Sequence, residues 1–317
     1  AYDALDEMFF HDSDNHVYSV RLNRTKGTLD EIFTVQPLDV GKSLNESLYA
    51  ETRSVVYASA TLAVDGQFDA FERAVGFNEG EDSRADVLKV DSSFDFDANM
   101  RVYVPTDMPE PQDPAYLPTL ESFLVDLHKA QRGSTLTLFT NRREMEQCFD
   151  VVHPALKEDD LRLVCQKWGV SVKGLRDDFL KDEHLSLFAL KSFWEGFDAP
   201  GATLKGVVIP KLPFGLPTDP LSCERQQRDD HAWAHYSLPH AVIEVKQAVG
   251  RLIRKSTDRG IVVLADKRLI TKYYGKKFLN SLPSNNIVMM SCADIVAEVA
   301  DRAAVESLVS ASGSSHS

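Results

Sequence analysis

Two arginines and a glutamine recur at helical spacing in the segment EVKQAVGRLIRK, residues 244–255. Gln247, Arg251 and Arg254 stand at positions i, i+4 and i+7, so a helix over 239–254 places them on one face, with apolar residues on the other. Arginine suits phosphoryl groups because its planar guanidinium donates two parallel hydrogen bonds and stays ionised. The pattern therefore predicts an anion site on this helix.

A second cluster, LFTNRREM, comes directly after an apolar run that reads as a strand. Ligands of open α/β sheets bind at the carboxyl ends of the strands, in the loops that lead into helices. Thr140, Asn141 and Arg142 occupy such a place, and their hydroxyl, amide and guanidinium groups beside free helix N–H donors suit a phosphate. The alternative is an ordinary N-cap, in which Thr140 or Asn141 closes the helix.

A third cluster lies in KSFWEGFDAPG, residues 191–201, after the next apolar strand. Gly196 permits close backbone approach, and the carboxylates of Glu195 and Asp198 can orient a ribose, a water or an arginine. A turn with capping carboxylates is the alternative. The anion site predicted at 247–254 has an alternative of its own. Buried arginines need a counter-charge, and an internal salt bridge to Glu195 or Asp198 would supply it.

The composition is that of a globular protein with a local basic segment. The chain has 317 residues and a formal net charge of -13, which excludes a generally basic, nucleic-acid-coated surface. Residues 246–277 nevertheless carry ten basic and two acidic side chains. No apolar run approaches the roughly 18 residues of a membrane span, and the first residues are acidic rather than signal-like, so a cytoplasmic location without membrane contact is expected. The four cysteines show no metal-ligand spacing, so we expect neither a metal site nor disulfides.

Short apolar runs alternate with helical segments through most of the chain. Because continuously apolar strands are typical of sheets covered on both faces, the alternation predicts an α/β fold with a doubly wound, mostly parallel sheet. The expected strands are 54–59, 135–140, 161–165, 185–190, 205–210 and 260–266, and the expected helices are 114–131, 142–157, 173–182, 221–236 and 239–254. A Pro-rich connector at 104–118 indicates a domain boundary near residue 100, and the small polar residues 310–317 indicate a flexible tail.

The segments YASATL, LFTNR, FWEGFDAPG, KLPFGLPTDPL and QAVGRLIRKSTDRG, followed by LADKR, closely resemble in order the second half of the DinG-like branch of the XPD-type superfamily 2 DNA helicases. The resemblance covers residues 35 to 285, and Q-x-x-G-R-x-x-R followed by D-x-G and D-x-R is its most specific part. It implies a RecA-like lobe. In such helicases two RecA-like lobes hold ATP between them, and the second lobe supplies arginine fingers.

The resemblance also implies roles for residues of this chain. Gln247, Gly250, Arg251 and Arg254 match the sixth helicase motif, whose arginines reach the nucleotide. Glu195, Gly196 and Asp198 match the fifth motif, which couples nucleotide to DNA. Thr140, Asn141 and Arg142 match the fourth motif, which contacts single-strand phosphates. Ser59, Ala60 and Thr61 match the third motif, which transmits hydrolysis to DNA movement.

The phosphate loop and the D-E-A-H box of a helicase have no convincing match in these residues. The segment QPLDVGKS has Gly41, Lys42 and Ser43 but Gln36 in place of the first glycine, and KDEHL lacks both the alanine and a preceding apolar strand. The sequence also begins in mid-pattern at Ala1. We therefore expect residues 1–100 to be the end of lobe one and residues 101–309 to be lobe two of a longer helicase.

Several partners follow from the resemblance: single-stranded DNA, ATP with Mg²⁺ held elsewhere, and an amino-terminal lobe that often carries an iron–sulfur cluster, for which this chain offers no cysteine pattern. The intact protein would act in DNA repair or replication, and this chain alone should not hydrolyse ATP. The alternative is a stand-alone, non-catalytic module that binds nucleic acid or nucleotide.

Overall fold

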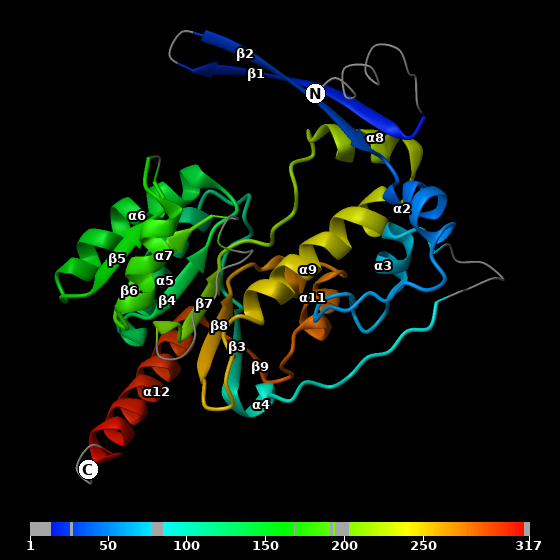
Figure 1. The fold of residues 1–317 in the computed structure, drawn as a ribbon. Helices are drawn as coiled ribbons and strands as arrows, with labels where there is room; N and C mark the ends of the chain where they lie inside the picture. Colours follow the sequence, from blue (N-terminus) through cyan, green and yellow to red (C-terminus); the bar gives the residue numbers. More distant parts are fainter. Residues whose placement is uncertain are drawn as a thin grey trace. The chain divides into compact units, whose positions relative to one another are not determined.

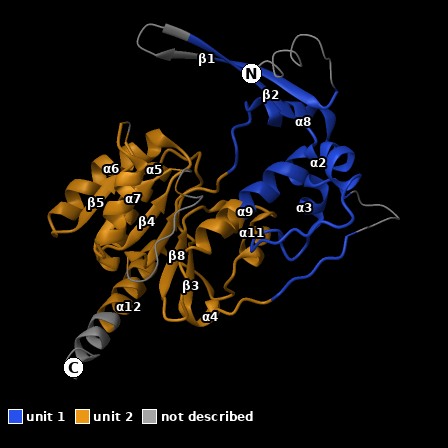
Figure 2. Ribbon diagram, viewed as in Figure 1, with its two compact units in different colours: residues 1–90, 214–243 blue, residues 91–213, 244–317 orange. Residues whose placement is uncertain are grey.

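The computed structural model describes residues 14–25, 28–77, 85–167, 169–190, 193 and 203–313. By its contacts the chain divides into two compact units (Figure 2). Unit 1 comprises residues 1–90 and 214–243, and unit 2 comprises residues 91–213 and 244–317. The assignment of residues 1–100 and 101–309 to two helicase lobes stays a prediction. The two compact units do not have the bounds of the predicted lobes, because residues 214–243 belong to the same unit as residues 1–90.

Unit 2 is built on a seven-stranded sheet in the order β5-β6-β4-β7-β8-β3-β9, with every neighbouring pair parallel (Figure 1). The strands, in that order, are Arg162–Cys165, Leu185–Ala189, Thr135–Leu138, Gly206–Ile209, Gly260–Leu264, Met100–Pro105 and Ile287–Met290. All residues of β4, β6, β7 and β8 are buried, as expected for strands covered on both faces. The predicted doubly wound parallel sheet is confirmed.

Helices cover both faces of this sheet. Buried apolar side chains of α5 (Tyr116–Gln131), α6 (Arg142–Lys157) and α12 (Cys292–Gly313) form one core with residues of β3, β6, β7 and β8. Figure 1 shows the end of α9 (Leu238–Val249) and α11 (Gly275–Ser281) on the other side of the sheet. The remaining helices of unit 2 are α4 (Phe96–Asn99), α7 (Val172–Lys181) and α10 (Arg268–Thr271).

Unit 1 contains an antiparallel hairpin of β1 (His16–Thr25) and β2 (Thr28–Pro37), paired from His16 with Pro37 to Thr25 with Thr28. Helix α8 (Pro220–Arg228) packs against β1, and its Arg225 donates to the carbonyl oxygen of Leu38 at 3.2 Å. The other helical segments are α2 (Val40–Leu44), α3 (Asp69–Ala74) and two single π-helical turns, Asn45–Tyr49 and Trp233–Ser237. The Gly41-Lys42-Ser43 segment lies within α2, whose N-cap is Asp39.

Four expected elements differ from the structure, besides the helix expected over 239–254, which ends at Val249. Residues 54–59 form no strand, because no described strand pairs with them, and the side chain of Val56 is 88% exposed. The helix expected over 221–236 is interrupted where Asp229, in extended conformation, caps α8. Strand β3 lies partly within the expected connector, and α12 continues to Gly313, into the part expected to be a flexible tail.

Candidate functional site

The segment that follows α9 carries both predicted arginine fingers. The helix ends at Val249, not at residue 254, so the prediction that Gln247, Arg251 and Arg254 share one helical face is wrong. The N–H of Gly250 still bonds to the carbonyl of Lys246 at 2.9 Å, but the N–H of Arg251 bonds to Ala248, three residues back, at 3.3 Å. This tightening marks the last turn, so Arg251 and Arg254 lie in a loop.

We call residues 250–259 the arginine loop, and two kinds of contact hold it. Leu252 and Ile253 are buried, which fixes the loop on the core. The carboxylate of Asp258, which is only 8% exposed, accepts hydrogen bonds from the backbone N–H groups of Arg254 and Lys255, both at 2.9 Å. Because hydrogen bonds to a charged acceptor are stronger than neutral ones, Asp258 is a polar anchor of the loop backbone at residues 254 and 255.

The three predicted residues of this segment are all accessible. Gln247 and Arg251 are half-buried and Arg254 is exposed, so none is sealed in the core. Each makes contacts of its own in the folded chain. Glu195, Gly196 and Asp198 lie outside the described residues, so their predicted role, and an ion pair between them and the arginines, stay predictions.

The arginine loop lies at the amino-terminal edge of the sheet. A Cβ added to Gly260, the first residue of β8, would be 2.7 Å from Cδ1 of Leu252 and 2.5 Å from the carbonyl oxygen of Lys205, which precedes β7. This places the loop beside the starts of β7 and β8. The arginines therefore lie at a different edge from Thr140, Asn141 and Arg142, which follow the carboxyl end of a strand.

Thr140, Asn141 and Arg142 lie at the opposite edge, after the carboxyl end of β4. Asn141 is the N-cap of α6, and its side chain accepts from the N–H groups of Arg143 at 2.8 Å and Glu144 at 3.3 Å. The N-cap interpretation is thus correct for Asn141. Since β7 and β8 rise about 3.3 Å per residue, the two edges are about 15 Å apart, too far for one phosphate to bind at both.

Arg142 and Thr140 present different chemistry at this edge. The guanidinium of Arg142 donates to the carbonyl of Gln166 at 2.8 Å and lies 3.7 Å from Glu146, and its side chain is 28% exposed. Thr140 is exposed. Arg142 is therefore held in place by its neighbours while part of its surface remains accessible, which is the arrangement that a fixed phosphate contact needs.

Sequence reasoning gave no role to the polar residues that follow β7 and β8. Lys211 pairs with Glu144 at 2.5 Å and lies 5.0 Å from the ring centre of Tyr116. Asp266, which is fully buried, accepts from the N–H of Leu212 at 2.8 Å and pairs with Arg268 at 2.6 Å. These contacts stabilise the carboxyl edge. Lys211 and Asp266 lie in KLPFGLPTDPL and LADKR, which the sequence showed only as part of the resemblance.

Ser59, Ala60 and Thr61 belong to unit 1. The Ser59 hydroxyl oxygen accepts from the N–H of Thr61 at 3.3 Å, and the two hydroxyl oxygens are also 3.3 Å apart. Ser59 and Ala60 are exposed and Thr61 is half-buried. The segment is a small hydroxyl-stabilised turn, and its predicted role in coupling stays a prediction.

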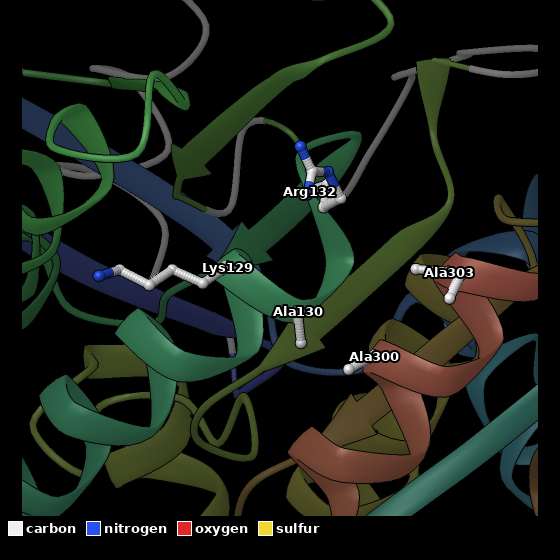
Figure 3. Close-up of a pocket in the computed structure, with 6 residues that line it drawn as sticks. Lys129, Ala130, Arg132, Ala300 and Ala303 are labelled. Atoms are coloured by element: carbon white, nitrogen blue, oxygen red, sulfur yellow. The ribbon is translucent and has the colours of Figure 1, made fainter. Parts of the chain in front are cut away.

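A hollow of about 430 Å³ between α5 and α12 contains none of the predicted residues. Figure 3 shows Ala130 of α5 facing Ala300 and Ala303 of α12, whereas the side chains of Lys129 and Arg132 extend away. The ammonium of Lys129 pairs with Asp159 at 2.7 Å. The hollow therefore offers no converging polar groups of the kind that a ligand site needs.

The structure also bears on metals, thiols and membranes. All four cysteines are free, and burial raises the pKa of Cys165 to about 12, so its thiol stays protonated near neutral pH. Within the described residues there is no group of three or more His, Cys, Asp or Glu side chains that could hold a metal ion. None of the described helices is long and apolar enough to cross a membrane.

Comparisons with known proteins agree with this fold. A profile of the helicase C-terminal domain family matches residues 124–285, which are 162 of the 317 residues. The chain is 34% identical over 261 residues to the ATP-dependent DNA helicase DinG of Photobacterium profundum, covering 80% of this chain and 37% of that protein. It is 29% identical over 306 residues to a Bacillus subtilis protein named 3'-5' exonuclease DinG, covering 94% and 32%.

A solved structure of an XPD helicase superposes with a TM-score of 0.59 and 18% identity, over 81% of this chain and 46% of that one. This likeness shows the fold, and the sheet of unit 2 is RecA-like. The chain spans only 32% to 37% of the length of the two DinG relatives. By the family profile, the two relatives and the shared fold, the chain belongs to the helicase C-terminal domain family, in its DinG-like, XPD-type branch.

Proposed function

We propose that this chain is the carboxyl-terminal part of an ATP-dependent DNA helicase, in which unit 2 is the second RecA-like lobe. ATP and Mg²⁺ would be held mainly by an amino-terminal lobe, which supplies the phosphate loop and the metal ligands. Arg251 and Arg254, with Gln247, would complete the site by contacting the phosphates from this side. The relatives named ATP-dependent DNA helicases support this reading.

The arginine loop is the observation that carries the proposal. Arg254 is exposed, and its backbone N–H is held by the buried carboxylate of Asp258, so its side chain starts from a fixed point of the loop. Catalysis of phosphoryl transfer is mostly positioning and electrostatic stabilisation, so a fixed, accessible arginine is what this chemistry requires. A mobile guanidinium would lose this benefit, because its ordering would oppose binding of the transition state.

The placement of the two motifs supports a division of labour within the lobe. The arginines lie at the amino-terminal edge of the sheet, and Thr140, Asn141 and Arg142 lie at the carboxyl edge. The nucleotide and the DNA strand would then contact opposite edges. We propose that Glu195, Gly196 and Asp198, which lie between β6 and β7 in the sequence, couple the two sites.

An ATPase assay with single-stranded DNA, on this chain beside the intact protein, tests the proposal. The intact protein should hydrolyse ATP in a DNA-stimulated reaction, and residues 1–317 alone should not, because they offer no phosphate loop. DNA-stimulated hydrolysis by the chain alone would overturn the assignment of catalysis to two lobes. An intact protein that binds DNA without any hydrolysis would favour the non-catalytic module instead.

A further inference from the structure

A basic surface of unit 2 follows β8. Residues 267–293 contain five basic residues and no acidic one, in a chain with 48 acidic residues. Arg268 is neutralised by Asp266, and Lys267 lies near Asp107. The basic residues that lie further along the chain, around α10 and α11, play no part in the arginine loop or in the contacts of Arg142.

We call Lys272, Tyr273, Lys276 and Lys277 the lysine–tyrosine patch. All four are exposed, and Tyr273, with 81% of its surface accessible, is the most exposed aromatic side chain in the described part of the chain. Its ring lies edge-on to Tyr274 at 5.5 Å between centres, and Tyr274 packs toward Phe278 at 6.4 Å. The half-buried Tyr274 therefore supports the exposed ring.

The lysines of the patch are largely uncompensated. Lys272 lies 3.6 Å from Glu110, but both side chains are about 40% exposed, and such surface pairs contribute little. Neither Lys276 nor Lys277 forms an ion pair with any residue that the structure describes. Among the described residues, Glu110 lies beside Lys272 and Asp107 lies near Lys267, and no ion pair neutralises Lys276 or Lys277, so these two lysines keep the patch positive.

We propose that the lysine–tyrosine patch binds single-stranded DNA, with Tyr273 stacking on a base and Lys276 and Lys277 contacting phosphates. Non-specific single-strand sites combine a basic surface with aromatic side chains, because every base offers a flat face to stack on. A purely electrostatic surface would not need the exposed ring. This inference rests on the proposed function, which already places single-stranded DNA on this lobe.

The position of the patch fits the path of the strand. Residues 266–277 follow the carboxyl end of β8, and Thr140, Asn141 and Arg142 follow the carboxyl end of β4. Only β7 separates these strands, so the ends of β4 and β8 are about 10 Å apart across the sheet, and Lys272 contacts Glu110, which follows β3 at the same edge. One extended strand of a few nucleotides can therefore contact Arg142 and continue to the patch along the same edge.

Fluorescence anisotropy with a labelled oligothymidylate of about 12 nucleotides, within the usual range of single-strand sites, tests the proposal on the 317-residue chain. Tyr273→Ala should weaken binding about fivefold or more, and Tyr273→Phe, which keeps the ring, should stay within about twofold. On an abasic oligonucleotide Tyr273→Ala should have no effect. Lys276→Ala with Lys277→Ala should flatten the slope of log affinity against log salt by about 1.4.

A double variant of the exposed Lys173 and Lys181 in α7, each to Ala, is the matched control, because it removes the same charge elsewhere and should change neither quantity. Urea midpoints of all variants should equal that of the unmodified chain, since every changed side chain is exposed. If the patch variants bind normally while Arg142→Ala weakens binding, the lysine–tyrosine patch does not bind DNA, and the proposed function stands. If the unmodified chain binds no oligonucleotide at low salt, both fail.

Discussion

The anchoring of the arginine loop by Asp258 leads to a quantitative prediction. Asp258→Ala removes the carboxylate that accepts from the N–H groups of Arg254 and Lys255, both at 2.9 Å. Each hydrogen bond to a buried charge contributes about 1.5–3 kcal/mol, but these two donors belong to exposed residues and regain water. We therefore expect a net loss of about 1–3 kcal/mol, concentrated in the loop.

Hydrogen exchange measures this loss residue by residue. Protection of the Arg254 and Lys255 amides should fall about 5- to 150-fold in Asp258→Ala, the factor that corresponds to 1–3 kcal/mol. Asp258→Asn keeps an oxygen acceptor without the charge and should lose about half as much free energy. In the intact protein, DNA-stimulated ATP turnover should also fall, because a displacement of about 1 Å of a positioned group costs on the order of 100-fold.

Asp95→Ala is the control for this experiment, because Asp95 caps α4 by accepting from the N–H of Ala98 at 2.9 Å. It removes a carboxylate that accepts one backbone hydrogen bond in the same unit, and it should lower protection around α4 only. Unchanged protection at Arg254 and Lys255 in Asp258→Ala would show that the buried Leu252 and Ile253 hold the loop without the carboxylate. The account of a polar anchor would then be refuted.

Three further predictions concern the sheet and its edges. Arg142→Ala should reduce the salt slope of single-strand binding by about 0.7, and a full slope would remove Arg142 from the DNA path. Burial lowers the pKa of His128 from 6.5 to about 3, so below pH 6.5 the unfolded chain binds a proton at this residue while the folded chain does not. The free energy of unfolding is therefore undiminished by His128 above pH 6.5, and below it falls by about 1.4 kcal/mol per pH unit. His128→Gln should abolish this slope in urea unfolding between about pH 4.5 and 6.5, and a persisting slope would assign it to other groups. Gly260→Ala should cost about 1–3 kcal/mol because its Cβ would clash with the carbonyl oxygen of Lys205 and with Leu252. Gly215→Ala, with open space around it, should be neutral, and equal urea midpoints for both variants would contradict the close approach at Gly260.

Much of the fold of unit 2 was predictable because its signals are local. Helix α6 was predicted over 142–157 and spans Arg142–Lys157, since an N-cap at Asn141 precedes a clear helical period. The buried strands β4, β6, β7 and β8 were predicted to within two residues at each end, because they are continuously apolar. Strand β3 was missed because a Pro-rich connector begins within it.

The arginine loop could not be predicted in the same way. Leu252 and Ile253 continue the apolar pattern of α9, so the sequence does not reveal that the helix has ended. Beyond the helix, the chain is held by the carboxylate of Asp258, which accepts from the N–H of Arg254, and by Leu252, which lies close to Gly260. The residues of the motif were readable from the sequence, but the edge of the sheet at which they lie depends on strand order and chain direction.

The run at 54–59 shows a second limit of sequence reasoning. Its β-branched and aromatic residues have the composition of a buried strand, but a strand forms only where neighbouring strands supply hydrogen-bond partners. No described residue of this chain does so, and Val56 stays exposed. The pattern of a segment thus indicates what it can form, and its neighbours decide whether it does.

The most direct test of the central claim is the turnover of ATP by the intact protein carrying Arg254→Ala. DNA-stimulated hydrolysis should fall by about 10³- to 10⁵-fold, the range for loss of an arginine finger, while nucleotide affinity stays within about tenfold. Arg259→Ala, which removes an exposed arginine at the end of the same loop, should leave turnover unchanged. Normal turnover in Arg254→Ala would contradict the assignment of this loop to the ATP site.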